Sequence, residues 1–176
     1  MHCMWFFVIF VYMKKICTLG YLERGNMICL STKKTNFGAG KLNGYGGKIE
    51  KNETIVDCIV REILEESTVV VSPEKCELVG ELYMKVTDNE EWKETAIYVF
   101  KISDFIGEPI ETNEMKPEWY MKDSIPYENM WISDQKWFPT FLDGKKFVGH
   151  FTLSEAGVLN QWNIKEIGDE KKYKIL

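Results

Sequence analysis

Three glutamates within five positions are the residues of this 176-residue chain best suited to chemistry: Glu62, Glu65 and Glu66. In a helix, residues three and four apart project from adjoining surface, so the three carboxylates would lie close together. They repel one another unless a cation lies between them, and hard oxygen ligands select Mg²⁺ or Mn²⁺. A divalent ion held there neutralises phosphate charge and lowers the pKa of bound water. The pattern indicates metal-assisted phosphoryl chemistry; the alternative is a solvated acidic helix face.

A helix and a glycine-rich loop must position these carboxylates. Residues 54–67 carry apolar side chains at 55, 58, 59 and 63, which is the spacing of a helix with one buried face. The segment 36–48, just before this helix, contains five glycines. Such a segment predicts a loop with unusual backbone angles or close approach to a ligand. The loop can therefore bring backbone groups to the same ions as the carboxylates.

The rest of the chain reads as short strands and one further helix. Residues 16–22 and 27–31 predict a hairpin that turns about residues 23–26. Further strands are expected at 77–86, 94–102, 117–121, 145–153 and 158–167, and a helix at 133–142, where Pro139 limits its length. No linker divides this pattern, so we expect one mixed α/β domain over residues 16–176.

The carboxylates belong to a longer motif with many fixed positions. The stretch Gly47-x5-Glu53-x7-Arg61-Glu62-Ile63-Leu64-Glu65-Glu66-Ser67-Thr68-Val69 resembles the Nudix box, G-x5-E-x7-R-E-U-x-E-E-x-G-U, in which U is aliphatic. The resemblance implies an α/β/α sandwich around a mixed sheet and hydrolysis that needs Mg²⁺, with Mn²⁺ as a possible substitute. It also implies a set of metal ligands: Glu62, Glu65, Glu66 and the carbonyl of Gly46. Glu62 would also act as base toward the attacking water, and Arg61 would pair with Glu53 to hold loop to helix.

Only Thr68 departs from the box, because the family has glycine at that position. Glycine there suits a left-handed residue that ends the helix. A β-branched residue in that conformation costs roughly 1–2 kcal/mol. We therefore expect the helix to end in a different way. No metal ligand is lost by this change.

The resemblance extends beyond the box to one subfamily. The segments KKTNFGAGKLNGYGGKIE, EMKPEWY, DSIPYENMW and KWFPTFLDGKKFVGHF resemble the animal-type MutT homologues, the oxidised purine nucleoside triphosphatases. Members of that subfamily convert nucleotides such as 8-oxo-dGTP to the monophosphate and pyrophosphate, which cleans the nucleotide pool and avoids DNA damage. The resemblance therefore implies a small-molecule nucleotide substrate.

Pocket residues can be carried over one at a time by this resemblance. Asn43 matches a position that reads a purine edge, Phe37 and Trp131 match aromatic walls, and Trp137 matches a second aromatic residue near the pocket. The full set of implied substrate-binding residues is Thr18, Lys33, Phe37, Asn43, Tyr45, Gly46, Gly47, Lys48, Trp131, Ser133 and Asp134. Glu114 matches a further acid near the metal. Ser133 stands where the family has an acid beside Asp134, which puts acceptance of both oxidised guanine and oxidised adenine in question.

Two other readings of the motif stay open. One is a Nudix pyrophosphatase for another nucleoside diphosphate derivative, such as ADP-ribose, a dinucleoside polyphosphate or an RNA cap. ADP-ribose enzymes tend to carry a proline after the box, whereas none occurs between Pro73 and Pro109 here. The other is a binding module without catalysis, which is disfavoured because all the box carboxylates are present.

Composition limits the partners and the compartment. The chain has 27 acidic and 22 basic residues, a net charge of −5, and a protein that binds nucleic acid polymers usually has a basic excess. The five cysteines form no C-x-x-C pair, as expected for reduced thiols in a cytoplasmic protein.

The apolar run in residues 1–15 is too short to span a bilayer and has its lysines after the run. We interpret it as an N-terminal extension, or as a mis-assigned start with translation beginning at Met13. We expect no membrane partner and a monomer.

Overall fold

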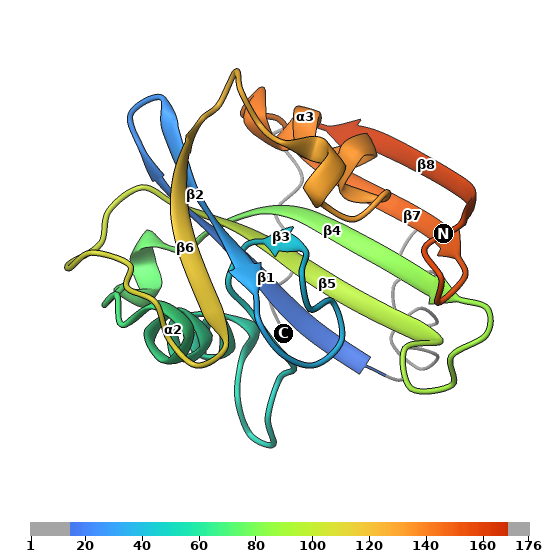
Figure 1. Cartoon of the computed structure of the whole chain (residues 1–176), viewed down its shortest axis with the longest axis horizontal. Coiled ribbons are helices and arrows are strands. Elements are labelled where there is room, and N and C mark those ends of the chain that lie inside the picture. Colours follow the sequence, from blue (N-terminus) through green and yellow to red (C-terminus); the bar gives the residue numbers. More distant parts are fainter. Residues whose placement is uncertain (1–14, 169–176) are drawn as a thin grey trace.

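The computed structural model describes residues 15–168, so the apolar run and the alternative start at Met13 lie outside the described residues. The strands are β1 (Lys15–Arg24), β2 (Met27–Lys33), β3 (Leu42–Asn43), β4 (Glu77–Val86), β5 (Glu94–Ile102), β6 (Met115–Met121), β7 (Lys146–Leu153) and β8 (Leu159–Ile167). The helices are α2 (Ile55–Ser67) and α3 (Asp134–Leu142), with short 3₁₀ turns η1 (Pro73–Lys75) and η2 (Tyr127–Asn129). Figure 1 shows their arrangement.

The strands form one mixed sheet in the order β3-β2-β1-β5-β4-β7-β8. The remaining strand, β6, pairs with β2 along the edge opposite to β1. β1 runs parallel to β5 and β4 runs parallel to β7, whereas the remaining neighbours are antiparallel. The two parallel contacts join strands far apart in sequence, so the pocket described below draws on distant segments. The last two predicted strands are both present and pair antiparallel with each other, beginning at Lys146↔Ile167.

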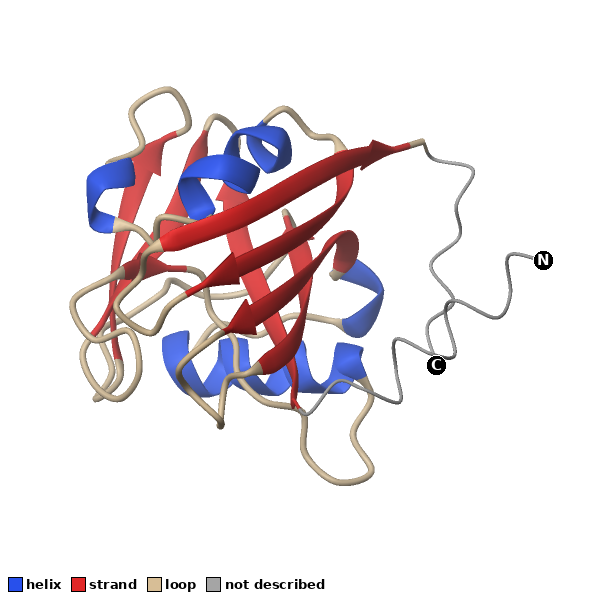
Figure 2. Ribbon diagram, turned by 90° about the vertical axis from the view of Figure 1, so that its right-hand side faces the viewer, coloured by secondary structure: helices blue, strands red, loops and turns tan. Residues whose placement is uncertain are grey.

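Two apolar cores lie on opposite faces of the sheet. One contains Trp137, Phe138 and Phe141 of α3, and the other contains Ile59 and Ile63 of α2. In Figures 1 and 2 the two helices lie on different sides of the strands. The expected layered α/β arrangement around a mixed sheet is therefore confirmed.

Helix α2 begins with a capping box. The hydroxyl of Thr54 accepts a hydrogen bond from the backbone N–H of Asp57 (3.1 Å), and the Asp57 carboxylate accepts one from the N–H of Thr54 (3.1 Å). The apolar side chains predicted for the buried face do face the core. The helix packs closely on β1, because a Cβ atom at Gly20 would lie 2.7 Å from Cδ1 of Ile59.

The end of α2 corrects one expectation. Thr68 adopts the left-handed conformation, with φ 65° and ψ 5°, and its N–H donates to the carbonyl of Leu64 (2.9 Å). The helix therefore ends as it would with glycine. The neighbours Ser67 and Val69 are fully buried, and the N–H of Ile110 donates to the carbonyl of Ser67 (3.1 Å). These contacts fix the direction of the chain, so Thr68 adopts the left-handed conformation despite its cost for a β-branched residue.

Two further local expectations were wrong in detail. The first hairpin turn consists of Gly25 and Asn26 alone, because the register pairs Arg24 with Met27. Gly25 has φ 59°, which a two-residue hairpin turn requires. The glycine-rich segment 36–48 is not entirely loop, since it contains β3, which pairs with β2.

Within residues 15–168 no helix is long and apolar enough to cross a membrane.

Candidate active site

The glycine-rich segment runs directly beside β1 and reaches the carboxylate helix. The N–H of Thr18 donates to the carbonyl of Gly47 (2.9 Å). A Cβ atom at Gly46 would collide with the carbonyl of Thr18, and one at Gly47 would collide with the carboxylate of Glu62. Glycine is required at position 46 because backbone approaches backbone there more closely than a side chain permits, whereas a side chain at position 47 would displace the Glu62 carboxylate. The box helix and the loop therefore meet at these two residues.

Arg61 joins the loop to the helix through several contacts. Its Nε donates to Glu53 Oε1 (2.7 Å) and its Nη2 donates to Glu53 Oε2 (3.0 Å), a bidentate pair. Its Nη1 donates to Glu62 Oε1 (2.7 Å) and to Glu65 Oε2 (3.1 Å). Its Nη2 also donates to the carbonyl of Lys48 (3.3 Å). The hydrogen bonds from Arg61 lower the pKa of Glu53, so this carboxylate stays charged as a structural anchor.

Two of the three box carboxylates are largely removed from water. Glu66 is 4% exposed, and its Oε2 accepts a hydrogen bond from the N–H of Gly46 (2.8 Å). Lys33 Nζ lies 3.8 Å from Glu66 Oε1. Burial raises the pKa of Glu66 to about 7 and also raises the pKa of Glu62 above its ordinary value, in spite of Arg61. Glu65 differs, because its side chain is 59% exposed.

This donor set fits a hard divalent cation. Buried carboxylates with raised pKa values are relieved by a positive charge, and carboxylate with carbonyl oxygen is the chemistry that Mg²⁺ prefers. Among residues 15–168 no three acidic, histidine or cysteine side chains already converge on one point. The carboxylates instead face Arg61, Lys33 and the N–H of Gly46, which are cationic or donor groups. Glu114 adds negative charge near Glu66 and raises its pKa further.

A pocket of about 180 Å³ adjoins the carboxylates. Gly46 and Gly47 form part of its wall, as does Lys33. The pocket therefore shares residues with the acidic site, and the two are continuous. Its apolar floor comes from the strands β4, β5 and β7: Leu82, Met84, Val86, Ile97 and Leu153.

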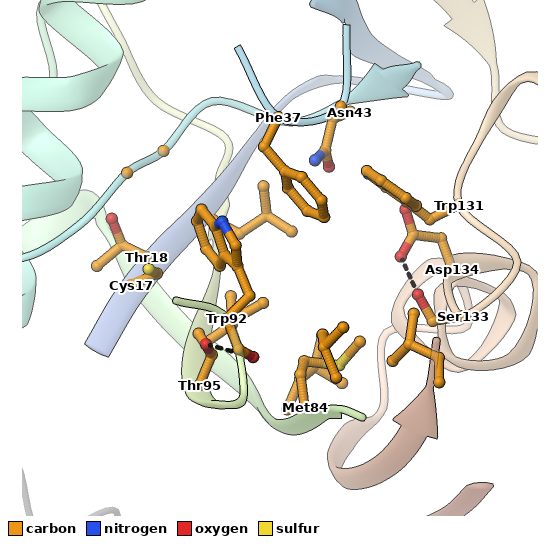
Figure 3. Close-up of a pocket in the computed structure, with 18 of the residues that line it drawn as sticks. Cys17, Thr18, Phe37, Asn43, Met84, Trp92, Thr95, Trp131, Ser133 and Asp134 are labelled. Carbon is orange, nitrogen blue, oxygen red and sulfur yellow. Dashed lines mark hydrogen bonds between the residues drawn. The ribbon is translucent and has the colours of Figure 1, made fainter. Parts of the chain in front are cut away.

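One end of the pocket carries a buried polar group at Asp134. Its Oδ1 accepts hydrogen bonds from Trp137 Nε1 (3.0 Å) and Ser133 Oγ (3.3 Å). Its Oδ2 is buried and has no hydrogen-bond partner among the described residues. Burial raises the pKa of Asp134 to about 7. Ser133 and Asp134 lie together at the pocket wall in Figure 3.

Asn43 presents an amide to the same pocket. Its Oδ1 accepts hydrogen bonds from Tyr21 Oη (3.2 Å) and from the N–H of Gly44 (2.9 Å). These bonds fix the orientation of the amide and leave Nδ2 as the donor for a ligand. Asn43 and Asp134 both line the pocket, so hydrogen-bonding groups approach it from two segments.

Aromatic rings line the pocket between these polar groups. Phe37 stacks on Trp131 with ring centroids 5.1 Å apart and planes at 23°. It also stacks on Trp92, again at 5.1 Å, with planes at 18°. In Figure 3, Trp92 and Trp131 lie on opposite sides of the pocket and Phe37 lies between them at its edge. The site can therefore hold a flat aromatic ring. The ring would lie next to the box carboxylates, which can bind phosphate by way of a divalent cation.

Comparison with known proteins agrees with this geometry. The model of the NUDIX domain matches residues 14–141, which include the glycine-rich loop and the whole carboxylate helix. The chain belongs to the Nudix family. It is 34% identical over 159 residues to an oxidized purine nucleoside triphosphate hydrolase of Danio rerio, which covers 90% of this chain and 99% of that protein. It is also 34% identical over 153 residues to the protein of that name from Mus musculus, covering 87% and 96%.

Solved structures support the Nudix fold. A mutator MutT protein of Bacillus halodurans superposes with a TM-score of 0.74 at 25% identity, covering 85% of this chain and 97% of that one. A NUDIX hydrolase of Nitrosomonas europaea superposes with a TM-score of 0.60 at 17% identity, covering 75% and 90%. The second likeness concerns the fold alone.

Most of the residues implied for substrate binding by the Nudix resemblance line the pocket. They are Thr18, Lys33, Phe37, Asn43, Gly46, Gly47, Trp131, Ser133 and Asp134. Thr18 is almost fully buried, with its hydroxyl 3.3 Å from Cys58 Sγ. Glu114 is exposed, and its backbone carbonyl accepts a hydrogen bond from the N–H of Lys34 (2.7 Å).

Two implied residues do not line the Nudix pocket. Tyr45 is fully buried in the core, where its hydroxyl accepts a hydrogen bond from Ser31 Oγ (3.2 Å) and lies 3.3 Å from Cys29 Sγ. Lys48 is exposed, and its carbonyl binds Arg61. Tyr45 and Lys48 therefore lie outside the pocket lining, and their assignment to substrate binding stays a prediction.

Several lining residues were not predicted from the sequence. Met84 and Ile97 face the pocket from β4 and β5, and Cys17 does so from β1. Alternation along these strands marks an inward face, but cannot say which inward residues border a cavity. Trp92 had a better signal, since a tryptophan directly after the polar stretch Asp88-Asn89-Glu90-Glu91 is unusual for a solvated turn.

Proposed function

We propose that this Nudix protein hydrolyses oxidised purine nucleoside triphosphates such as 8-oxo-dGTP to the monophosphate and pyrophosphate, with Mg²⁺ as cofactor. The observation that carries the proposal is the continuity of two sites. Gly46 and Gly47 line the aromatic pocket and contact the carboxylates of Glu66 and Glu62. A base in the pocket would have its phosphates at the carboxylate helix. The names of the relatives in Danio rerio and Mus musculus support the same substrate class.

The recognition half of the site suits a purine edge. Asn43 Nδ2 offers a donor, and the Asp134 carboxyl offers a donor when protonated and an acceptor otherwise. Because burial raises the pKa of Asp134 to about 7, both forms are accessible near neutrality. Ser133 occupies the second polar position and donates to Asp134. We propose that Asp134 selects the base and that Ser133 narrows the choice between oxidised guanine and oxidised adenine.

At the carboxylate helix and the glycine-rich loop, where the reaction would take place, the box residues have separate roles. Glu62, Glu65, Glu66 and the carbonyl of Gly46 would hold Mg²⁺, with Glu114 nearby. When bound, the ion supplies charge neutralisation at the phosphates and a lower pKa for the attacking water. Glu62 would accept the proton of that water, which is the role that the resemblance to the Nudix box implies. Lys33, between the pocket and Glu66, contacts the phosphate chain.

Arg61 and Glu53 act as positioning residues. Their bidentate pair fixes the loop that carries Gly46 and Gly47 against the helix. The free cysteines at 17, 29, 58 and 76 agree with a reducing compartment, so we propose that the protein acts in the cytoplasm. We also propose that it acts as a monomer.

A panel of substrates tests the proposal. It should contain 8-oxo-dGTP, 2-oxo-dATP, a methylated purine triphosphate, dGTP and ADP-ribose, each with and without Mg²⁺. We expect Mg²⁺-dependent release of pyrophosphate, fastest with an oxidised or methylated purine. Preference for ADP-ribose would replace the proposed substrate class, and absence of metal-dependent turnover on every member would favour a binding module.

A further inference from the structure

Trp92 is a large aromatic residue in the turn between β4 and β5, among polar neighbours. No motif that identifies the family includes it, and it was not among the residues implied by the resemblance. Its ring nevertheless lines the pocket and stacks on Phe37 at 5.1 Å and 18°. Figure 3 places it across the pocket from Trp131, with Met84 below. The turn therefore contributes a wall to the site.

The position of Trp92 is fixed from its own turn. The side chain of Asn89 accepts hydrogen bonds from the N–H of Glu91 (3.0 Å) and of Trp92 (3.1 Å). The hydroxyl of Thr95 donates to the carbonyl of Trp92 (3.4 Å). These bonds hold the backbone on either side of the tryptophan, so its ring is directed by a defined turn.

Lys15 fixes the ring itself. Its ammonium group lies 3.5 Å from the centroid of the Trp92 ring and forms an ion pair with Glu91 Oε1 (2.7 Å). The Lys15 side chain is 7% exposed, so this cation has exchanged most of its water for the indole face and one carboxylate. A cation held in this way restrains the indole. Lys15 is therefore a positioning residue for Trp92.

Phe37 stacks on both tryptophans, at 18° to Trp92 and at 23° to Trp131. Lys15 lies over the Trp92 ring as well, so the indole lines the pocket with its edge. An aromatic edge packs favourably against the face of another flat ring. A bicyclic purine fills more of the space between the pocket walls than a pyrimidine does, and therefore makes more contact with Trp92.

We propose that Trp92 is a specificity-determining residue that contacts the nucleobase and favours purines over pyrimidines. The inference rests on the proposed function, because it requires a nucleobase in the pocket. Trp92 has no part in the chemical step, since the reacting groups lie on α2 and the glycine loop. It therefore acts on KM and on product affinity, and leaves kcat nearly unchanged.

The test compares Trp92→Ala, Trp92→Leu and Trp92→Phe with the wild-type protein. For the best purine triphosphate of the panel, we expect Trp92→Ala and Trp92→Leu to raise KM about ten-fold, with kcat within about two-fold of wild type. The inhibition constant of the purine monophosphate should rise by a similar factor, whereas that of pyrophosphate, which has no base, should not change. Trp92→Phe should recover most of the affinity. The ratio of kcat/KM for dGTP to that for dCTP should fall in the alanine variant.

Trp162 supplies a matched control. It lies on β8, is 52% exposed and does not line the pocket. Trp162→Ala removes the same side chain and should leave KM and both inhibition constants unchanged. Trp92→Leu keeps apolar volume in the turn, so it decides the question if Trp92→Ala does not fold.

Three outcomes would overturn the inference. Unchanged KM in both Trp92→Ala and Trp92→Leu would remove Trp92 from the base contact. Equal weakening of monophosphate and pyrophosphate would show a general disturbance of the site instead of a base contact. If the wild-type protein neither hydrolyses nor binds any purine nucleotide, the proposed function fails first and the inference fails with it. The wild-type measurements alone distinguish that case from the other two.

Discussion

The buried carboxyl of Asp134 allows a quantitative prediction about stability. Burial raises its pKa from 3.8 to about 7. Between these two values the folded protein keeps a proton that the unfolded chain has released. The free energy of unfolding therefore falls as the pH rises through this window and changes no further above pH 7. At about 1.4 kcal/mol per pH unit, the rise from pH 5 to pH 7 removes about 3 kcal/mol.

Replacement of Asp134 by asparagine should abolish this loss. Asparagine keeps an oxygen that can accept the hydrogen bond from Trp137 Nε1 but does not ionise. Urea unfolding at pH 5 and pH 8 should show the variant gaining about 3 kcal/mol relative to wild type between these two conditions. Any fixed cost of burying the amide affects both pH values equally, so it cancels in this comparison.

Asp123 provides the control for this experiment, because it is exposed and its carboxylate accepts a hydrogen bond from the neighbouring Ser124 Oγ (2.9 Å). Asp123→Asn should change stability by less than about 0.5 kcal/mol at both pH values. If Asp134→Asn and wild type lose stability in parallel from pH 5 to pH 8, Asp134 is already ionised in the fold. That result would refute the account of the polar end of the pocket.

Three further predictions concern α2 and the core. Glu62→Gln and Glu66→Gln should each lower kcat by at least about a hundred-fold in a Mg²⁺-dependent assay while the variants still unfold in one cooperative urea transition, because each removes a charge without changing shape. Thr68→Gly should raise the free energy of unfolding by about 0.5–1 kcal/mol in urea, since relief of the left-handed threonine exceeds the added entropy of the unfolded chain. Tyr45→Phe should lower stability by about 1 kcal/mol through loss of its core hydrogen bond, with KM unchanged.

Clear contrary results exist for each of these predictions. Glu74→Gln, on the exposed turn η1, is the control for the charge removals and should keep full activity. Comparable activity in the Glu62, Glu66 and Glu74 variants would remove the metal-ligand assignment. A loss of stability in Thr68→Gly would mean that its side chain contributes more than its backbone costs. A raised KM in Tyr45→Phe would return Tyr45 to the substrate site.

Local patterns predicted the helices and strands well. The apolar spacing of α2 and the alternation of β7 and β8 are read from neighbouring residues, and the structure has both. The end of α2 was mispredicted because it depends on distant contacts. The hydrogen bond from Ile110 to Ser67 fixes the chain there, and this tertiary restraint outweighs the preference of threonine.

The candidate site was only partly predictable for a related reason. Spacing within the box placed Glu62, Glu65 and Glu66 on one helix, but the sharing of Arg61 between Glu53 and the box requires the loop geometry. The sequence could not show that Tyr45 faces the core, because its direction depends on the pairing of the loop with Gly20 of β1, which directs alternate side chains to opposite sides.

Trp92 reaches the pocket through long-range packing that no motif records. The parallel pairing of β1 with β5 brings Lys15 beside Thr95, and hence next to the turn that precedes β5. Only this pairing explains how a residue at the start of the described chain restrains a pocket residue 77 positions later. The position of the tryptophan beside a polar turn could have drawn attention to it, but the sequence could not have given it a partner.

The central claim is that the carboxylate helix and the aromatic pocket act on one purine triphosphate. The most direct test is the ratio of kcat/KM for 8-oxo-dGTP to that for ADP-ribose in Mg²⁺, with identification of the phosphate product. The account predicts a ratio far above one, with stoichiometric pyrophosphate and nucleoside monophosphate. A ratio below one, or inorganic phosphate as the product, would contradict it.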